Sequence, residues 1–154
     1  MVATDELDVS ATVLRKCGVS SCGKPADLDG LLSESDYVSL HVPLTEETNN
    51  MIGRRELKLM KQTAILINVA RGGLIDEPAL VDALTNQRLR GAGLDAFSRE
   101  PIAADDPLLG LDNVLATPHN AGGSHGTSRR RGEVAAENVD RVARGLPPLY
   151  QITL

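Results

Sequence analysis

Three side chains in the middle and later parts of the sequence have the chemical types needed to bind and protonate a small organic acid. Arg71 lies in a glycine-containing stretch, residues 70–73, and its planar guanidinium can hold a carboxylate by two parallel hydrogen bonds. His119 follows a proline, and imidazole exchanges a proton readily near neutral pH. Glu100 could hold the second ring nitrogen, which favours the protonated imidazole and keeps a proton available for a carbonyl oxygen. The three types predict a site that holds a carboxylate and transfers a proton.

Each histidine, acid and arginine of this set also has an ordinary structural interpretation. His119 could be a hydrogen-bonded loop histidine, Arg71 a member of a surface ion pair, and Glu100 a solvated acid in a turn. His41 lies inside an apolar run, where a buried, hydrogen-bonded histidine is the commoner finding, whereas His125 is expected to be exposed at the start of a helix. The histidines have no close spacing to acids or thiols, so the sequence predicts no metal site.

The elements that must position these side chains follow from the periodicity of the apolar residues. Strands that alternate with helices favour a parallel sheet covered on both faces, which is the α/β doubly wound class. Within the helical stretch that starts near Pro78, Asp76 is the expected N-cap and Glu77 suits the positive end of the helix dipole. Strands are predicted at 37–42, 64–69, 91–95 and 113–117, with a remnant strand at 1–4, and helices at 28–32, 54–60, 78–84 and about 126–144.

Polar residues follow four of the predicted strands, at 41–43, 68–71, 95 and 117–119. Because ligands bind beyond the carboxyl ends of strands in such sheets, we expect these residues to converge on one edge. Residues 91–96 match the GxGxxG/A pattern of a dinucleotide-binding turn, but the predicted strand lies inside the match. This stretch is therefore predicted to be a strand and not a phosphate-binding turn.

Composition narrows the class of protein. The 154 residues are 42% hydrophobic and 24% charged, which fits one folded domain, and no window holds the roughly 20 apolar residues of a membrane-spanning helix. The net charge of −5 disfavours nucleic acid as a partner, and the basic residues 129–131 would point in three directions on a helix. Cys17 and Cys22 are expected to be free thiols in a reducing cytoplasm, so a cytoplasmic location is predicted.

Four motifs that occur in order resemble those of the D-isomer-specific 2-hydroxyacid dehydrogenases, the family of phosphoglycerate, glycerate, glyoxylate and D-lactate dehydrogenases. The resemblance runs from about Asp27 to Gly145 and is more specific than any single motif. The motifs are SDYVSLHVPLT at 35–45, INVARGGLID at 67–76, GLDAF at 93–97 followed by Glu100, and TPHNAGG at 117–123.

The resemblance implies an NAD-dependent oxidoreductase that transfers a hydride between the nicotinamide and a 2-oxo or 2-hydroxy acid. It implies that Arg71 binds the substrate, that His119 is the general acid/base and contacts the substrate, and that Glu100 pairs with that histidine. It also implies that NAD is favoured over NADP, because Asp5 resembles the acid that binds the adenosine ribose hydroxyls. The cofactor contacts that it implies are Asp5, Val42, Val69, Ala70, Arg71, Asp95, His119 and Gly122.

The sequence departs from the family in extent. We expect residues 1–145 to form a truncated, Rossmann-like NAD-binding domain that lacks the first strand and the glycine-rich turn, and residues 146–154 to form a tail that would return to a missing substrate domain. The resemblance also implies a homodimer formed through the cofactor domain. Two alternatives stay open: a non-catalytic dimerisation or regulatory module derived from the family, and an unrelated flavodoxin-like module.

Overall fold

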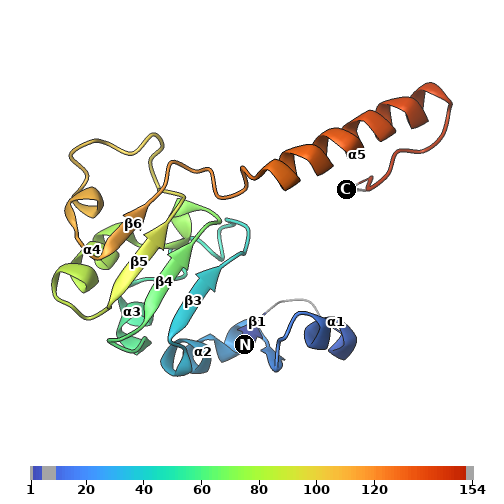
Figure 1. Ribbon diagram of the computed structural model, residues 1–154. Helices are drawn as coiled ribbons and strands as arrows, with labels where there is room; N and C mark the ends of the chain where they lie inside the picture. The colour runs from blue at the N-terminus through green and yellow to red at the C-terminus, as the bar shows by residue number, and fades with distance from the viewer. Residues whose placement is uncertain (1, 5–9, 152–154) are drawn as a thin grey trace. The chain divides into compact units, whose positions relative to one another are not determined.

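Strands and helices alternate along the chain in the computed structural model, which describes residues 2–4 and 10–151 (Figure 1). Two units, residues 1–119 and residues 120–154, are each described by themselves. The first holds β1 (Val2–Thr4), α1 (Ala11–Lys16), β2 (Ser21–Gly23), α2 (Leu28–Glu34), β3 (Tyr37–Leu40), α3 (Arg54–Leu59), β4 (Ile65–Asn68), α4 (Glu77–Thr85), β5 (Gly91–Leu94) and β6 (Val114–Ala116), with 3-10 turns at Pro25–Asp27, Gly72–Leu74 and Pro107–Gly110. The second holds α5 (His125–Ala143).

The predicted strands and helices are confirmed, with strand ends shifted by one or two residues. Four strands form one parallel sheet in the order β3-β4-β5-β6, and β1 pairs with β2 in a separate parallel pair. The match to GxGxxG/A is indeed a strand, β5. Two elements, α1 and β2, were not predicted, because β2 is only three residues of small side chains and α1 has no buried residue.

One face of the four-stranded sheet packs on the hydrophobic core. Val38 and Leu40 of β3 are buried, whereas the alternating Tyr37 and Ser39 are exposed. The helices α2, α3 and α4 lie side by side, α2 against α3 and α3 against α4. Within residues 10–119, the opposite face of the sheet retains exposed side chains, among them Leu115 of β6. The alternation of buried and exposed residues in β3 is that of a strand with one face on this core.

The start of α4 follows the sequence prediction. The Asp76 carboxylate accepts a hydrogen bond of 3.1 Å from the backbone N–H of Ala79, and Pro78 stands in the first turn. The apolar positions of the helix share one buried face, as their spacing predicts, and this face joins the core: Ala79, Leu80, Ala83 and Leu84. The N-terminus of α4 is thereby fixed beside the carboxyl ends of the strands.

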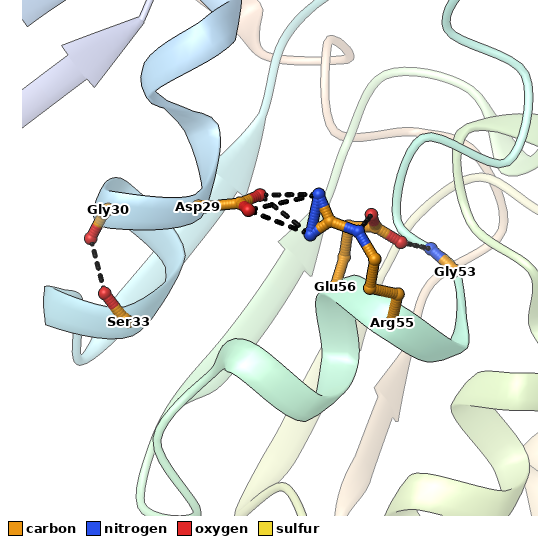
Figure 2. Close-up of polar contacts among 6 residues, drawn as sticks. All are labelled: Asp29, Gly30, Ser33, Gly53, Arg55 and Glu56. Atoms are coloured by element: carbon orange, nitrogen blue, oxygen red, sulfur yellow. Dashed lines mark hydrogen bonds and ion pairs between the residues drawn. The ribbon is translucent and has the colours of Figure 1, made fainter.

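An ion pair joins α2 to α3 (Figure 2). The guanidinium of Arg55 lies across the Asp29 carboxylate, with nitrogen to oxygen distances between 2.9 and 3.1 Å. Both side chains are more than half exposed, so the pair contributes at most about 1 kcal/mol. Figure 2 also shows Glu56 accepting a hydrogen bond from the Gly53 N–H at 3.1 Å, which caps the start of α3.

The second unit is a helix with its following segment folded back on it. Ser124 caps α5 by accepting a hydrogen bond of 3.1 Å from the Thr127 N–H. The Asn138 side chain then binds both backbone groups of Leu149, with the Leu149 N–H donating at 2.7 Å and the Leu149 carbonyl accepting at 3.3 Å. As predicted, His125 is exposed. No helix among the described residues is long and apolar enough to cross a membrane.

A close backbone contact joins the connection after β4 to the connection after β5. A Cβ placed on Gly72 would lie 1.9 Å from the carbonyl carbon of Phe97 and 2.2 Å from the backbone nitrogen of Ser98. No L side chain fits at this distance, so glycine is required here by packing and not by its backbone dihedrals. The contact sets how closely the two loops at the sheet edge approach each other.

We predict that Gly72→Ala destabilises the fold by about 1–3 kcal/mol or more, because the two backbones must separate to admit the methyl group. Gly30→Ala is the matched control, since Gly30 lies in α2 and nothing lies within 4 Å of an added Cβ; it should be neutral or stabilise by up to about 1 kcal/mol. Urea unfolding of the three proteins measures both effects. Equal stability of Gly72→Ala and the wild type would contradict the contact.

Candidate active site

The carboxyl ends of three neighbouring strands are tied together by hydrogen bonds beyond the strands themselves. The Asp95 N–H donates to the Asn68 carbonyl at 2.9 Å, and the Thr117 N–H donates to the Leu94 carbonyl at 2.9 Å. The Thr117 hydroxyl donates to the Asp95 carboxylate at 2.6 Å. The predicted convergence of polar residues at one sheet edge is thus confirmed for β4, β5 and β6. Asp95 is only 3% exposed, so its carboxylate is a buried hydrogen-bond acceptor that links the ends of β5 and β6.

Asn68 shapes the loop that carries Arg71. Its side chain is buried, with its oxygen accepting from the Ala70 N–H at 3.1 Å and its nitrogen donating to the Arg71 carbonyl at 2.8 Å. Both ends of the amide are therefore satisfied by the backbone of one short loop. The Arg71 guanidinium itself is exposed and donates to the Ala70 carbonyl at 2.7 Å. Asn68 was not predicted as a site residue, because its role depends on a local loop conformation that its neighbours in sequence do not specify.

Glu100 contacts two different parts of the chain with its two carboxylate oxygens. Oε1 accepts a hydrogen bond of 2.9 Å from the Phe97 N–H, and Oε2 lies 2.7 Å from Nδ1 of His119. The Phe97 N–H lowers the pKa of Glu100 most, followed by the hydrogen bond with His119, and the charge of Arg71 lowers this pKa further. Glu100 is therefore a carboxylate at neutral pH.

An ionised Glu100 fixes the tautomer of His119. A carboxylate can only accept hydrogen bonds, so the hydrogen in the contact belongs to Nδ1 of the histidine. This leaves Nε2 as the nitrogen that can take or give a proton elsewhere. His119 has a φ of 51°, and its backbone N–H donates to the Thr117 carbonyl at 3.0 Å. A non-glycine residue rarely adopts this left-handed conformation, and such residues are frequent at functional sites.

A pocket of about 730 Å³ lies at the carboxyl ends of β3 and β4. Four of the predicted cofactor contacts line it, Val42, Val69, Ala70 and Arg71, together with His41, Pro43 and Leu44. The expectation of a buried His41 is wrong: β3 ends at Leu40, and His41 is exposed with Nε2 2.8 Å from the Ser39 hydroxyl. The apolar run therefore extended past the end of the strand, which left its last residues in the loop.

The structure brings some predicted site residues together and leaves others apart. Glu100 and His119 are in contact, and Arg71 is near enough for its charge to act on Glu100. Gly122 belongs to the second unit, so its place relative to this site is not described, and Asp5 lies outside the described residues. No cluster of potential metal ligands occurs within residues 2–4 and 10–151.

The NAD binding domain of the D-isomer specific 2-hydroxyacid dehydrogenases matches residues 7–121 of this chain. The chain belongs to this family. A glyoxylate reductase of Korarchaeum cryptofilum is 55% identical over 122 residues, which cover 79% of this chain and 37% of the relative. A D-3-phosphoglycerate dehydrogenase of Methanocaldococcus jannaschii is 46% identical over 119 residues, which cover 77% of this chain and 22% of that protein. The chain thus spans about a third or less of the length of these dehydrogenases.

Solved structures of the family have the same fold. A D-lactate dehydrogenase with NAD⁺ from Lactobacillus jensenii superimposes with a TM-score of 0.85 at 32% identity, covering 99% of this chain and 48% of that one. A D-isomer specific 2-hydroxyacid dehydrogenase of Xanthobacter autotrophicus in complex with NADPH gives a TM-score of 0.76 at 31% identity, covering 99% and 69% of the two chains. The fold is therefore the Rossmann-like fold of an NAD-binding domain, as predicted.

The lowered pKa of Glu100 gives a pH dependence of stability with a definite sign. Because the pKa is lower in the folded than in the unfolded chain, the contribution is present above the ordinary value of 4.5 and is lost as the pH falls through the lowered value. We predict that Glu100→Gln loses less unfolding free energy than the wild type between about pH 6 and about pH 3. Urea unfolding across this range measures the difference, and parallel curves would contradict the prediction.

Proposed function

We propose that this chain carries the acid/base pair and the carboxylate-binding arginine of an NAD-dependent enzyme that interconverts 2-oxo and 2-hydroxy acids. The observation that carries the proposal is the contact between Glu100 and Nδ1 of His119, which leaves Nε2 for a substrate oxygen. Arg71 follows β4, the strand beside β5, and its exposed guanidinium has further N–H groups for an anion besides the one that it donates to the Ala70 carbonyl. A substrate with a carboxylate next to its carbonyl group has the two features that these residues would recognise.

The pocket at the ends of β3 and β4 fits the nicotinamide end of the cofactor. Its volume admits a flat aromatic ring, Val42, Val69 and Ala70 supply apolar contacts, and Arg71 lines the same pocket. These residues would therefore hold the reactive end of the dinucleotide, and the nicotinamide would supply or accept the hydride.

Side chains of this chain would transfer the proton and bind the substrate carboxylate. In reduction, Arg71 holds the substrate carboxylate, and protonated His119 gives its Nε2 proton to the carbonyl oxygen as a hydride arrives at the carbonyl carbon. The hydride supplies two electrons and one proton, and His119 supplies the second proton. Together they convert the 2-oxo acid to the 2-hydroxy acid. In oxidation, neutral His119 takes the hydroxyl proton at Nε2. Glu100 orients the imidazole ring through Nδ1 in both directions.

The domain limits and the association of copies are part of the same proposal. We propose that residues 1–145 belong to the NAD-binding domain, that residues 146–154 lead toward a substrate domain, and that two copies associate. The family match supports the part of the first range that runs from residue 7 to residue 121. Glyoxylate and hydroxypyruvate are the first substrates to test, because relatives are named glyoxylate reductase and glyoxylate/hydroxypyruvate reductase B.

Two experiments test the function. Calorimetry with NADH and NADPH, with light scattering on the same sample, asks whether the 154-residue chain binds a cofactor and associates. A chimera in which residues 7–121 replace the corresponding segment of the K. cryptofilum glyoxylate reductase asks whether they support turnover. We expect the chimera to reduce glyoxylate. A chimera with native circular dichroism and no activity would contradict the proposal, and association of the chain without cofactor binding would favour a non-catalytic dimerisation module.

We predict that His119→Ala lowers kcat of the chimera by about 10²- to 10⁴-fold, because the carbonyl oxygen loses its proton donor. Cofactor affinity should change little, since the imidazole acts on the substrate. The matched control is Lys58→Ala, which removes an exposed basic side chain of α3 that does not line the pocket and should leave turnover unchanged. Steady-state kinetics separate kcat from KM, and equal turnover of His119→Ala and the parent chimera would remove His119 from the mechanism.

We predict that Arg71→Lys lowers kcat/KM by about tenfold or more, because a single ammonium group cannot replace two parallel guanidinium hydrogen bonds to a carboxylate. Arg88→Lys serves as its control, since Arg88 is also exposed but lies in the turn between α4 and β5, at the amino end of that strand. Turnover of a series of 2-oxo acids provides the measurement. The carboxylate role fails if both lysine variants match the parent chimera.

A further inference from the structure

Glu77, the first residue of α4, reaches the loop that carries Glu100. Its Oε1 accepts a hydrogen bond of 2.7 Å from the Ser98 N–H, and its Oε2 accepts one from the Ser98 hydroxyl. Both oxygens of one carboxylate thus bind a single residue that lies 21 positions later in the chain. A favourable charge near the positive end of a helix would not require this geometry, because any carboxylate in the first turn provides that charge.

Ser98 directly follows the residue whose N–H holds Glu100. The Phe97 N–H donates to Oε1 of Glu100, and Oε2 of the same carboxylate meets Nδ1 of His119. Rotation of the peptide group between Phe97 and Ser98 changes the path of the backbone that leads to Glu100. Anchoring Ser98 by both its N–H and its hydroxyl therefore restricts the conformation on which the contact with His119 depends.

Gly72 holds the same peptide from a second point. Its missing side chain lets the backbone of Phe97 and Ser98 approach to a distance at which no Cβ would fit. Gly72 lies in the connection between β4 and α4, which also carries Arg71, and Glu77 is the first residue of the helix that follows it. The connection that carries the arginine therefore also fixes the loop that carries the glutamate.

We propose that Glu77 is a positioning residue that orients Glu100 toward His119 by holding Ser98. The effect of Glu77 on catalysis rests on the proposed function, whereas its hydrogen bonds to Ser98 are contacts that the structure shows. The reach of the side chain and its two acceptor positions are what the role requires, and its negative charge is secondary.

Three substitutions separate reach from charge. Glu77→Gln keeps the length and can still bind Ser98, by accepting from its N–H and donating to its hydroxyl. Glu77→Asp keeps the charge in the first turn of α4 but is one methylene too short to reach Ser98. Glu77→Ala loses both properties. Glu34→Ala is the matched control, because Glu34 is an exposed glutamate at the end of α2, outside the site.

Carbon-detected NMR titration of the Glu100 carboxyl group in the 154-residue chain provides the readout. We expect Glu34→Ala to titrate like the wild type, Glu77→Gln to titrate at or slightly below the wild-type midpoint, and Glu77→Asp and Glu77→Ala to raise the midpoint toward the ordinary value of 4.5. Removing the negative charge of Glu77 would by itself lower this midpoint, so a rise in Glu77→Ala reports lost positioning. Ser98→Ala, which loses only the hydroxyl contact, should give a smaller rise.

The opposite pattern, in which Glu77→Asp matches the wild type and Glu77→Gln raises the midpoint, would overturn the inference and leave a helix charge effect. An unchanged midpoint in Glu77→Ala would also overturn it. In the active chimera, we expect Glu77→Ala to lower kcat at least tenfold with the KM for NADH unchanged, and Glu77→Gln to restore kcat. If the chimera has no activity, the proposed function fails while the titration still decides the role of Glu77.

Discussion

The site depends on the close approach of two backbones, at Gly72 after β4 and at Phe97 after β5. Parallel strands bring their carboxyl ends to one edge, but the loops that follow can diverge, and this contact stops them from doing so. It places the loop of Arg71 beside the loop of Glu100. Hydrogen bonds of Asn68 and Asp95 to the neighbouring loop and strand ends then hold the edge from beneath.

The chemistry follows from how the two oxygens of Glu100 are divided. One is occupied by a backbone N–H, so only the other is free to orient His119, and the carboxylate cannot rotate without losing its backbone partner. The backbone hydrogen bond also keeps the group ionised, because it lowers the pKa of Glu100. A histidine held in this way has one nitrogen committed to the protein and one available to a substrate, which is what an acid/base catalyst requires.

Much of the fold and the candidate residues Glu100 and His119, which the structure places in contact, could be predicted from the sequence, because they follow from local patterns. Periodicity located the strands and helices of the main sheet, and residue type selected Arg71, Glu100 and His119. Contacts between distant segments could not be predicted: nothing near Glu77 in the sequence points to Ser98. The exposure of His41 was also missed, since an apolar run does not reveal where the strand within it ends. Short elements such as β2 carry too few residues to show a period.

The tautomer of His119 is the most direct test of this account. Nitrogen-15 NMR of the imidazole at alkaline pH, where the ring is neutral, distinguishes a hydrogen on Nδ1 from one on Nε2. We predict the Nδ1–H form for His119 in the wild-type chain, with exposed His125 giving the signals of a free imidazole in the same spectrum. A His119 that carries its hydrogen on Nε2 would contradict the contact with an ionised Glu100 and the acid/base role derived from it.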